Sequence, residues 1–326
     1  MTQIIQPTEE NILICSEEIK NGELVGFPTE TVYGLGADAF NENAVKKIFI
    51  AKGRPQDNPL IVHISNLEEI EKVATEIPKL AYELAERYMP GPLTLVLKKN
   101  ANIPDVVTAN GNTVGIRMPN NDIARKLIKY SNPIAAPSAN VSKHISPTTA
   151  KHVLDDLNGK IKYILDGGEC TCGIESTVLD LTSDIPTILR PGAVTKEMIE
   201  SVLGHVKDFK GEVKVAKAPG MKYKHYSPNV DSILVATPKD AMAVYSKNKN
   251  AVILGLKDFL YKCEDANTYS LGEDAKDYMR NIYSALRYAE KKYEYIIVQR
   301  LKGNGIEESI MNRVLKATNN NMYEGE

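Results

Sequence analysis

Two cations stand two residues apart in the segment 50–60, and their types suit the binding of an anion. Lys52 and Arg54 follow a helical pattern and precede a β-rich segment at 60–64, so we expect both in a connection. In an extended connection, residues i and i+2 point the same way, so the ammonium and the guanidinium would face one ligand. A solvated loop with two ordinary surface cations is the alternative, and this segment alone does not decide between them.

A second segment, residues 28–36, carries hydroxyl groups at alternate positions. If the segment is extended, Thr29, Thr31 and Tyr33 share one face, and Glu30 points to the other. A hydroxyl both donates and accepts a hydrogen bond, so this row could hold a polar ligand that carries both kinds of group. A strand with one solvated face is the alternative, because antiparallel sheets often have one.

Polar side chains also alternate in two later segments. The first presents Thr113, Gly115 and Arg117 on one face of a predicted strand, and a row that ends in a cation is unusual for a core. Ser138 and Asn140 are likewise two residues apart, just past a short apolar strand, where α/β proteins bind ligands. Both segments are therefore candidate parts of a binding site.

Ser146 has two interpretations of equal weight. It precedes Pro147 and a helical pattern over residues 150–157, so its hydroxyl suits the N-cap, with the proline at the first helical position. The same helix N-terminus favours an anion, so Ser146 is also a candidate ligand contact.

The composition is that of a globular protein without a strong preference for nucleic acid or membrane. The 326 residues are 43% apolar and 25% charged, and the formal net charge of −2 argues against gripping nucleic acid with the whole surface. No apolar run approaches the ~20 residues of a membrane span, and the N-terminus lacks a signal pattern, so we expect a cytoplasmic protein. The four cysteines predict reduced structural thiols, since Cys170 and Cys172 lack a second pair or a nearby histidine for a metal.

The order of predicted strands and helices divides the chain into two domains and a linker. Over residues 1–206, strands and helices interleave without strict regularity, which predicts an α/β domain with a mixed sheet and flanking helices. Residues 207–230 form a basic linker, in which six lysines face two acidic residues up to position 225. Residues 231–326 alternate regularly between strand and helix, as in a small doubly wound, Rossmann-like α/β domain. Glu308 replaces the third glycine of a dinucleotide fingerprint there, so we expect no nucleotide in this domain.

Taken together, these segments resemble the YrdC-like family of threonylcarbamoyl-AMP synthases. Lys52-Gly53-Arg54 and Ser138-Ala139-Asn140 match its K-x-R and S-x-N signature. The resemblance extends over most of residues 8–204, and the C-terminal domain is similar to that of the long, two-domain form. The other similar segments are residues 28–36, 113–119, 190–192 and 222–228.

The resemblance implies a fold, a reaction and a set of partners. The fold would be a twisted mixed α/β sheet with a deep basic cavity. The reaction would join L-threonine, bicarbonate and ATP into threonylcarbamoyl-adenylate with release of pyrophosphate. The product would pass to the machinery that modifies the tRNA adenosine at position 37, next to the anticodon, and the chain itself would make at most a weak contact with tRNA.

The resemblance also implies residue roles, with Lys52 and Arg54 as the catalytic cations. The residues expected to contact ATP are Lys52, Arg54, Asn58, Thr113, Ser138, Asn140, Ser146, Arg190, His225 and Tyr226, the last two from a linker that closes over the cavity. Those expected to contact L-threonine are Thr31, His63, Arg117, Ser176 and the backbone at Ala136.

The residue types agree with such chemistry. Nucleotidyl transfer needs positioning and charge neutralisation more than covalent help, and lysine and arginine supply both. His63 is a candidate proton acceptor or a hydrogen-bond partner of threonine. No paired carboxylates mark a protein site for magnesium, so Mg²⁺ would be carried with ATP. The alternative function is an RNA-binding module whose cationic cavity grips phosphates.

Overall fold

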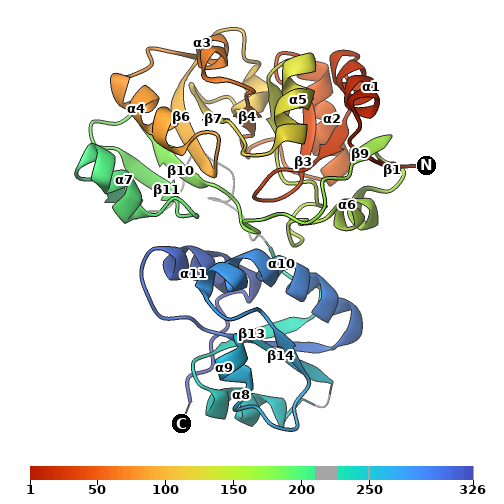
Figure 1. Ribbon diagram of the computed structural model, residues 1–326, viewed down its shortest axis with the longest axis vertical. Helices are drawn as coiled ribbons and strands as arrows, with labels where there is room; N and C mark the ends of the chain where they lie inside the picture. Colours follow the sequence, from red (N-terminus) through yellow and green to blue (C-terminus); the bar gives the residue numbers. More distant parts are fainter. Residues whose placement is uncertain (210–225, 249, 326) are drawn as a thin grey trace. The chain divides into compact units, whose positions relative to one another are not determined.

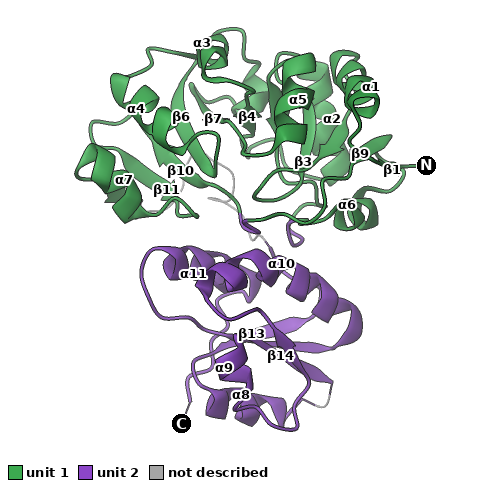
Figure 2. Cartoon of the chain, viewed as in Figure 1, with its two compact units in different colours: residues 1–142, 147–171, 175–223 green, residues 143–146, 172–174, 224–326 purple. Residues whose placement is uncertain are grey.

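The computed structural model describes residues 1–209, 226–248 and 250–325, and its contacts divide the chain into two compact units (Figure 2). Unit 1 comprises residues 1–142, 147–171 and 175–223. Unit 2 comprises residues 143–146, 172–174 and 224–326, so it includes two short loop segments that precede the predicted linker. Most of that linker, residues 210–225, lies outside the described residues.

The described part of unit 1 is built on a mixed sheet of twelve strands (Figure 1). Parallel pairs, such as β4 with β7, occur beside antiparallel pairs, such as β6 with β7. This mixture of directions confirms the predicted α/β fold class with a mixed sheet. The order along the sheet is β1 (Gln3–Ile5), β9 (Tyr163–Leu165), β2 (Val25–Phe27), β3 (Gly34–Asp38), β8 (Ile134–Ala136), β4 (Ile61–His63), β7 (Thr113–Arg117), β6 (Leu93–Lys99), β10 (Thr177–Asp180), β11 (Thr187–Arg190) and β12 (Lys207–Asp208), with β5 (Ala74–Thr75) paired to β6.

Helices flank these strands, and their first residues follow capping side chains. Thr8 caps the first helix, because its hydroxyl accepts the N–H of Asn11 at 3.2 Å. The cap predicted at Ser146 is wrong: the chain stays non-helical up to Thr149, whose hydroxyl accepts the N–H of His152 at 3.2 Å. The helices of unit 1 are α1 (Glu9–Lys20), α2 (Glu42–Lys52), α3 (Ile70–Val73), α4 (Lys79–Tyr88), α5 (Asp122–Tyr130), α6 (Ala150–Leu157) and α7 (Lys196–Leu203), with 3₁₀ turns at Leu67–Glu69 and Asp105–Val107.

The two faces of the central sheet differ in chemistry. Val62, Val114 and Leu95 point to the first face and join the main hydrophobic core, which also contains residues of α2, α3, α4, α6 and α7. On the second face, α1 and α5 pack against β2, β9 and β8 through Ile134, Ala136 and their neighbours. The next strands along the sheet, from β4 to β11, turn polar side chains to this second face, and these include the predicted site residues His63, Thr113, Arg117 and Arg190.

Unit 2 holds a parallel sheet with helices on both faces. The strand order is β13 (Asp231–Val235), β16 (Tyr295–Gln299), β14 (Ala251–Gly255) and β15 (Thr268–Ser270). Helices α8 (Pro238–Tyr245) and α9 (Lys257–Leu260) pack on one face, and α10 (Ala275–Lys292) and α11 (Ile306–Ala317) lie on the other (Figure 1). This arrangement confirms the predicted doubly wound domain. The sequence did not predict β15, because it is a short edge strand with polar residues around it.

All four cysteines are buried thiols that form no disulfide with one another, as predicted. Burial raises the pKa of the Cys15 thiol to about 12, so this thiol stays protonated and unreactive. Within the ranges that the structure describes, we find no helix with an apolar stretch long enough to cross a membrane.

Candidate active site

Cross-strand pairing gathers polar residues on the second face of the sheet. His63 of β4 is the register partner of Arg117 of β7, so their side chains point to the same face. Thr113, Gly115 and Arg117 occupy alternate positions of β7, and this confirms their predicted common face.

The same face continues across the next strands. Gly115 pairs with Val96 of β6, which places Thr94, two residues earlier, on the same side. Val178 of β10 pairs with Thr94 on one side and with Arg190 of β11 on the other. Strands β4, β7, β6 and β11 therefore present polar residues on one face, although these residues come from distant parts of the sequence.

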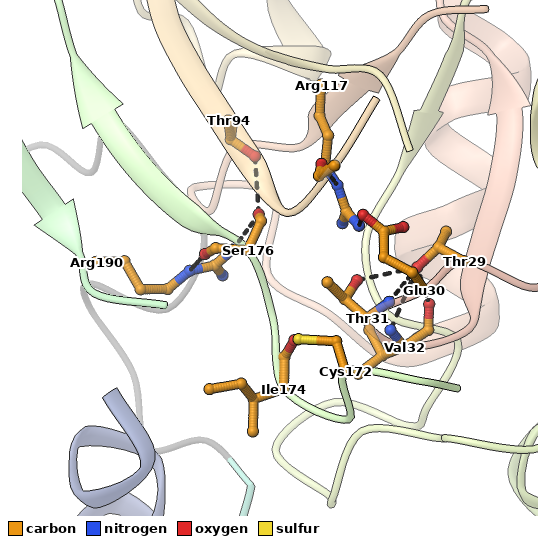
Figure 3. Close-up of polar contacts among 11 residues, drawn as sticks. Thr29, Glu30, Thr31, Val32, Thr94, Arg117, Cys172, Ile174, Ser176 and Arg190 are labelled. Atoms are coloured by element: carbon orange, nitrogen blue, oxygen red, sulfur yellow. Dashed lines mark hydrogen bonds and ion pairs between the residues drawn. The ribbon is translucent and has the colours of Figure 1, made fainter. Parts of the chain in front are cut away.

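Arg117 forms a buried ion pair that the sequence did not predict. Its Nη2 lies 2.8 Å from Oε1 of Glu30, and the two side chains are 5% and 7% exposed. Figure 3 shows the Glu30 carboxylate directed toward the guanidinium. Arg117 Nε also donates a hydrogen bond to the carbonyl oxygen of Gly91 at 3.3 Å. A buried charge needs a partner of opposite sign, so each residue compensates the charge of the other.

Residues 28–33 form a bend instead of the predicted strand. The hydroxyl of Thr29 donates to the carbonyl oxygen of Val32 at 2.7 Å and accepts the backbone N–H groups of Thr31 and Val32, both at 3.2 Å (Figure 3). Thr29 Oγ1 also lies within hydrogen-bonding distance, 2.9 Å, of Thr31 Oγ1. A threonine that bonds its own backbone offers the chain an alternative to a strand, and here that alternative is adopted.

The bend has two consequences for the predicted row of hydroxyls. The hydroxyl of Tyr33 donates to the carbonyl oxygen of Gly168 at 2.8 Å and accepts the N–H of Gly167 at 3.0 Å, so it is engaged elsewhere. The predicted row of three hydroxyls is therefore wrong, although those of Thr29 and Thr31 do lie together, 2.9 Å apart. The sequence analysis assigned no role to Glu30. Its acidic side chain was the available signal, because a strand pattern gives no reason for an acidic residue to be buried.

Arg190 holds Ser176 by two hydrogen bonds. Its Nε donates to the Ser176 carbonyl oxygen at 3.0 Å, and its Nη2 donates to the Ser176 hydroxyl at 3.1 Å. Thr94 Oγ1 lies 2.8 Å from the same hydroxyl. Figure 3 shows this group beside the Arg117–Glu30 pair. Arg190 is expected at ATP and Ser176 at threonine, so the two predicted subsites share a direct contact.

His63 is buried in its neutral form. Burial and the nearby positive charge of Arg117 lower the pKa of its imidazole from 6.5 to about 3. Its Nδ1 lies 3.2 Å from the carbonyl oxygen of Ile61, and its ring meets that of Phe27 edge-on with centroids 6.0 Å apart. A histidine with so low a pKa is a weak base at neutral pH, so the site favours the predicted hydrogen-bonding role over proton acceptance.

Lys52 joins the two parts of the K-x-R and S-x-N signature. It is the last residue of α2, and Gly53 ends the helix in the left-handed conformation, with φ 61° and ψ 37°. The Lys52 ammonium is buried and donates to the carbonyl oxygens of Ser138, at 2.5 Å, and of Asn140. The Ser138 hydroxyl donates to Asn140 Oδ1 at 2.5 Å. Segments 86 residues apart in the sequence therefore form one cluster.

Arg54 has other partners. Its Nη2 donates to the carbonyl oxygens of Asn58 at 3.2 Å and of Pro59 at 3.1 Å. The prediction that Lys52 and Arg54 lie in one extended segment is wrong, because α2 continues through Lys52 and a left-handed glycine separates the two cations. Asn58 is buried, and its Oδ1 accepts no hydrogen bond from the described residues. A buried acceptor without a donor is costly, so this oxygen is a candidate ligand contact.

The remaining predicted site residues belong to both units. Thr113 begins β7 and Ala136 ends β8, and both are buried in unit 1. Ser146 is fully buried and belongs to unit 2.

Two predicted residues come from the linker. Tyr226, in unit 2, is buried, and its ring stacks on that of Tyr283 with centroids 5.6 Å apart. His225 lies outside the described residues. Closure of the linker over a deep basic cavity therefore stays a prediction.

The charged groups of this site suit an anion better than a metal ion. Among the predicted site residues that the structure describes, the charged side chains are those of Lys52, Arg54, Arg117 and Arg190, and such cations match phosphate and carboxylate groups. Within the described ranges, no three potential metal-ligating side chains come together.

Fold and site together define a two-unit α/β protein whose larger unit carries polar residues, among them Arg117 and Arg190, on one face of its sheet. The family model described as "Telomere recombination", which covers Sua5, YciO and YrdC proteins, matches residues 17–192. The model described as "Threonylcarbamoyl-AMP synthase, C-terminal domain" matches residues 194–319. The chain therefore belongs to the YrdC-like family of threonylcarbamoyl-AMP synthases, in its two-domain form.

Relatives of the same length support this assignment. The threonylcarbamoyl-AMP synthase of Pyrococcus abyssi is 45% identical over 98% of both chains. That of Bacillus subtilis is 40% identical over 97% of this chain and 95% of the relative. The crystal structure of P. abyssi Sua5 complexed with L-threonine matches with a TM-score of 0.94 and 43% identity over the whole of both chains.

Proposed function

We propose that this chain condenses L-threonine, bicarbonate and ATP into threonylcarbamoyl-adenylate and releases pyrophosphate. The observation that carries the proposal is the bonding of the Lys52 ammonium to the carbonyls of Ser138 and Asn140, since it unites the signature segments of the family. Similarity over the whole chain to proteins named threonylcarbamoyl-AMP synthase supports the same reaction. The RNA-binding alternative has no comparable support, and we do not propose it.

ATP would be held by the cationic part of the site. Lys52 supplies a point charge, whereas Arg54 and Arg190 can each bind two phosphate oxygens at once. The polar residues that we assign to the nucleotide with them are Asn58, Thr113, Ser138, Asn140 and Ser146, joined by His225 and Tyr226 of the linker. The buried, unpaired Oδ1 of Asn58 supports its part in this set.

L-threonine would be held next to the nucleotide. Arg117 suits the carboxylate of the amino acid, and neutral His63 offers a hydrogen bond without adding charge. Thr31, Ser176 and the backbone at Ala136 complete the subsite. The structure of P. abyssi Sua5 complexed with L-threonine supports an amino-acid subsite in this fold.

The reaction then proceeds in two steps. The neutral amine of threonine attacks bicarbonate, a C–N bond forms, and the displaced hydroxyl leaves as water with a proton from nitrogen. An oxygen of the carbamate attacks the α-phosphorus of ATP, the bond from that phosphorus to the bridging oxygen breaks, and pyrophosphate takes the electron pair. The cations position the phosphates and neutralise the charge that develops on them.

Two further partners follow from this chemistry. Mg²⁺ would be carried to the site with ATP, because a metal ion of this kind usually bridges phosphates and keeps several waters. The threonylcarbamoyl-adenylate would be consumed by an enzyme that transfers the threonylcarbamoyl group to tRNA.

The test is pyrophosphate release from ATP by the purified full-length chain. We expect release only when L-threonine and bicarbonate are both present, and none when 3-hydroxybutyrate, which lacks the amine, replaces threonine. Release that does not depend on threonine, or no release with all three substrates, would refute the proposed function.

A further inference from the structure

Glu30 is a buried carboxylate whose hydrogen-bonding capacity is unused. The residue is 7% exposed, and neither of its carboxylate oxygens accepts a hydrogen bond from the residues that the structure describes. The ion pair brings Oε1 within 2.8 Å of Arg117 Nη2, but the two atoms are not aligned as a hydrogen bond. A buried carboxylate without donors is costly, so these oxygens are arranged for a donor that the described residues do not supply.

The pair of opposite charges is complementary to an α-amino acid. A free amino acid carries a carboxylate next to an ammonium, and here a guanidinium lies next to a carboxylate. Arg117 has five N–H donors, and its contacts with Gly91 and Glu30 engage only two of its nitrogens, so it can also bind a carboxylate. The bonds of Thr29 within the bend hold Glu30 in place.

We propose that Glu30 binds the α-ammonium group of L-threonine and removes one proton from it before the carbamate forms. This inference rests on the proposed function and adds the group that activates the nucleophile. One N–H bond of the ammonium breaks and its electron pair stays on nitrogen, while the proton forms an O–H bond with the Glu30 carboxylate. The neutral amine then attacks bicarbonate, and the proton that nitrogen loses next leaves with the displaced hydroxyl as water.

The other polar groups nearby are poorer candidates for this step. Burial and Arg117 make His63 a weak base. The hydroxyls of Thr31 and Ser176 donate or accept hydrogen bonds, but they do not take a proton at neutral pH. Glu30 differs from these groups because its carboxylate has the charge opposite to that of the ammonium and lies 2.8 Å from the arginine expected to hold the substrate carboxylate.

A binding cycle, in which two ligands are compared on the wild-type chain and on one variant, tests the contact between Glu30 and the amine. L-threonine and 3-hydroxybutyrate are titrated calorimetrically into the wild-type chain and into Glu30→Gln, without ATP or bicarbonate. Glu68→Gln serves as the matched control, because Glu68 is an exposed glutamate elsewhere in unit 1. For Glu30→Gln we expect threonine affinity to fall by about 10- to 100-fold, because threonine loses a charge-assisted bond, whereas affinity for 3-hydroxybutyrate should stay the same or rise, because Arg117 loses a competing carboxylate.

The other outcomes overturn the contact. Equal losses for both ligands would mean that Glu30 only supports Arg117, and no loss for threonine would mean that it does not touch the amine. If Glu30→Gln does not fold, as judged by circular dichroism, Glu30→Asp is used in the same cycle. The wild-type chain provides a check without any variant, since equal affinity for threonine and 3-hydroxybutyrate would also exclude an amine contact.

A pH profile tests the proton transfer separately. Without Glu30, the amine must lose its proton to water, so the rate of pyrophosphate release by Glu30→Gln should rise about tenfold per unit between about pH 7 and pH 9, below the pKa of the free amine. The wild-type rate should rise less steeply, and parallel profiles would overturn the proton transfer. A wild-type chain that releases no pyrophosphate would refute the proposed function instead, while the binding cycle would still decide the role of Glu30.

Discussion

Replacing Lys52 by methionine removes one charge from the centre of the proposed ATP subsite and keeps most of the side-chain volume. Lys52 is 2% exposed, and its ammonium donates to the carbonyl oxygens of Ser138 and Asn140. Each such bond to a charged donor contributes about 1.5–3 kcal/mol, and the cost of burying the ammonium offsets part of the sum. We therefore expect Lys52→Met to lower the free energy of unfolding by about 2–3 kcal/mol.

The effect of Lys52→Met on catalysis should exceed its effect on stability. The loss of one positioned group that stabilises the negative charge developing on the phosphates typically lowers kcat by about 10²- to 10³-fold. The rate of pyrophosphate release by the folded variant should fall by that factor. Urea unfolding and pyrophosphate release are measured on the same preparation. Lys46→Met is the matched control, because Lys46 lies on the same helix with a 44% exposed side chain. A folded Lys52→Met chain with wild-type kcat would refute the role assigned to this lysine.

Three further changes test the geometry of the rest of the site. Arg190→Lys cannot keep both bonds to Ser176, so we expect the KM for threonine to rise about 10-fold, and an unchanged KM would show that Ser176 does not need the clamp. The lowered pKa of His63 means that the unfolded chain binds a proton first as the pH falls below 6.5, so stability drops by about 2 kcal/mol between pH 6.5 and pH 5. The free energy of unfolding is measured by urea unfolding at each pH. In His63→Gln it should no longer fall by this amount between pH 6.5 and pH 5, and the same fall as in the wild-type chain would contradict the lowered pKa of His63. Thr29→Val removes the bonds that hold the bend, so we expect about 1–2 kcal/mol lower stability and weaker threonine binding, whereas unaltered binding would show that the bend keeps its form without them.

Regular periodicity accounts for what the sequence predicted well. The alternation in β7 put Thr113, Gly115 and Arg117 on one face, and cross-strand pairing confirms it, because the period of a strand depends only on local geometry. The same reasoning failed for residues 28–33, where the Thr29 side chain bonds the backbone and bends the chain. Local periodicity carries no information about such a bond.

Contacts between distant segments were the other source of error. Lys52 was expected in an extended connection, but helix α2 includes it, and its partners lie near residue 140. Glu30 drew no functional prediction, since its importance comes from Arg117, which is 87 positions later in the chain. A single sequence gives residue types and local order, whereas these contacts depend on how the sheet brings its strands together.

The most direct test of the proposed function is the identity of the nucleotide product. The chain is incubated with ATP, L-threonine and carbon-13-labelled bicarbonate, and the products are analysed by mass spectrometry. We predict an adenylate that contains both threonine and the labelled carbon, formed together with pyrophosphate. An unlabelled threonyl-adenylate, or AMP and pyrophosphate formed without incorporation of bicarbonate, would contradict the proposed reaction.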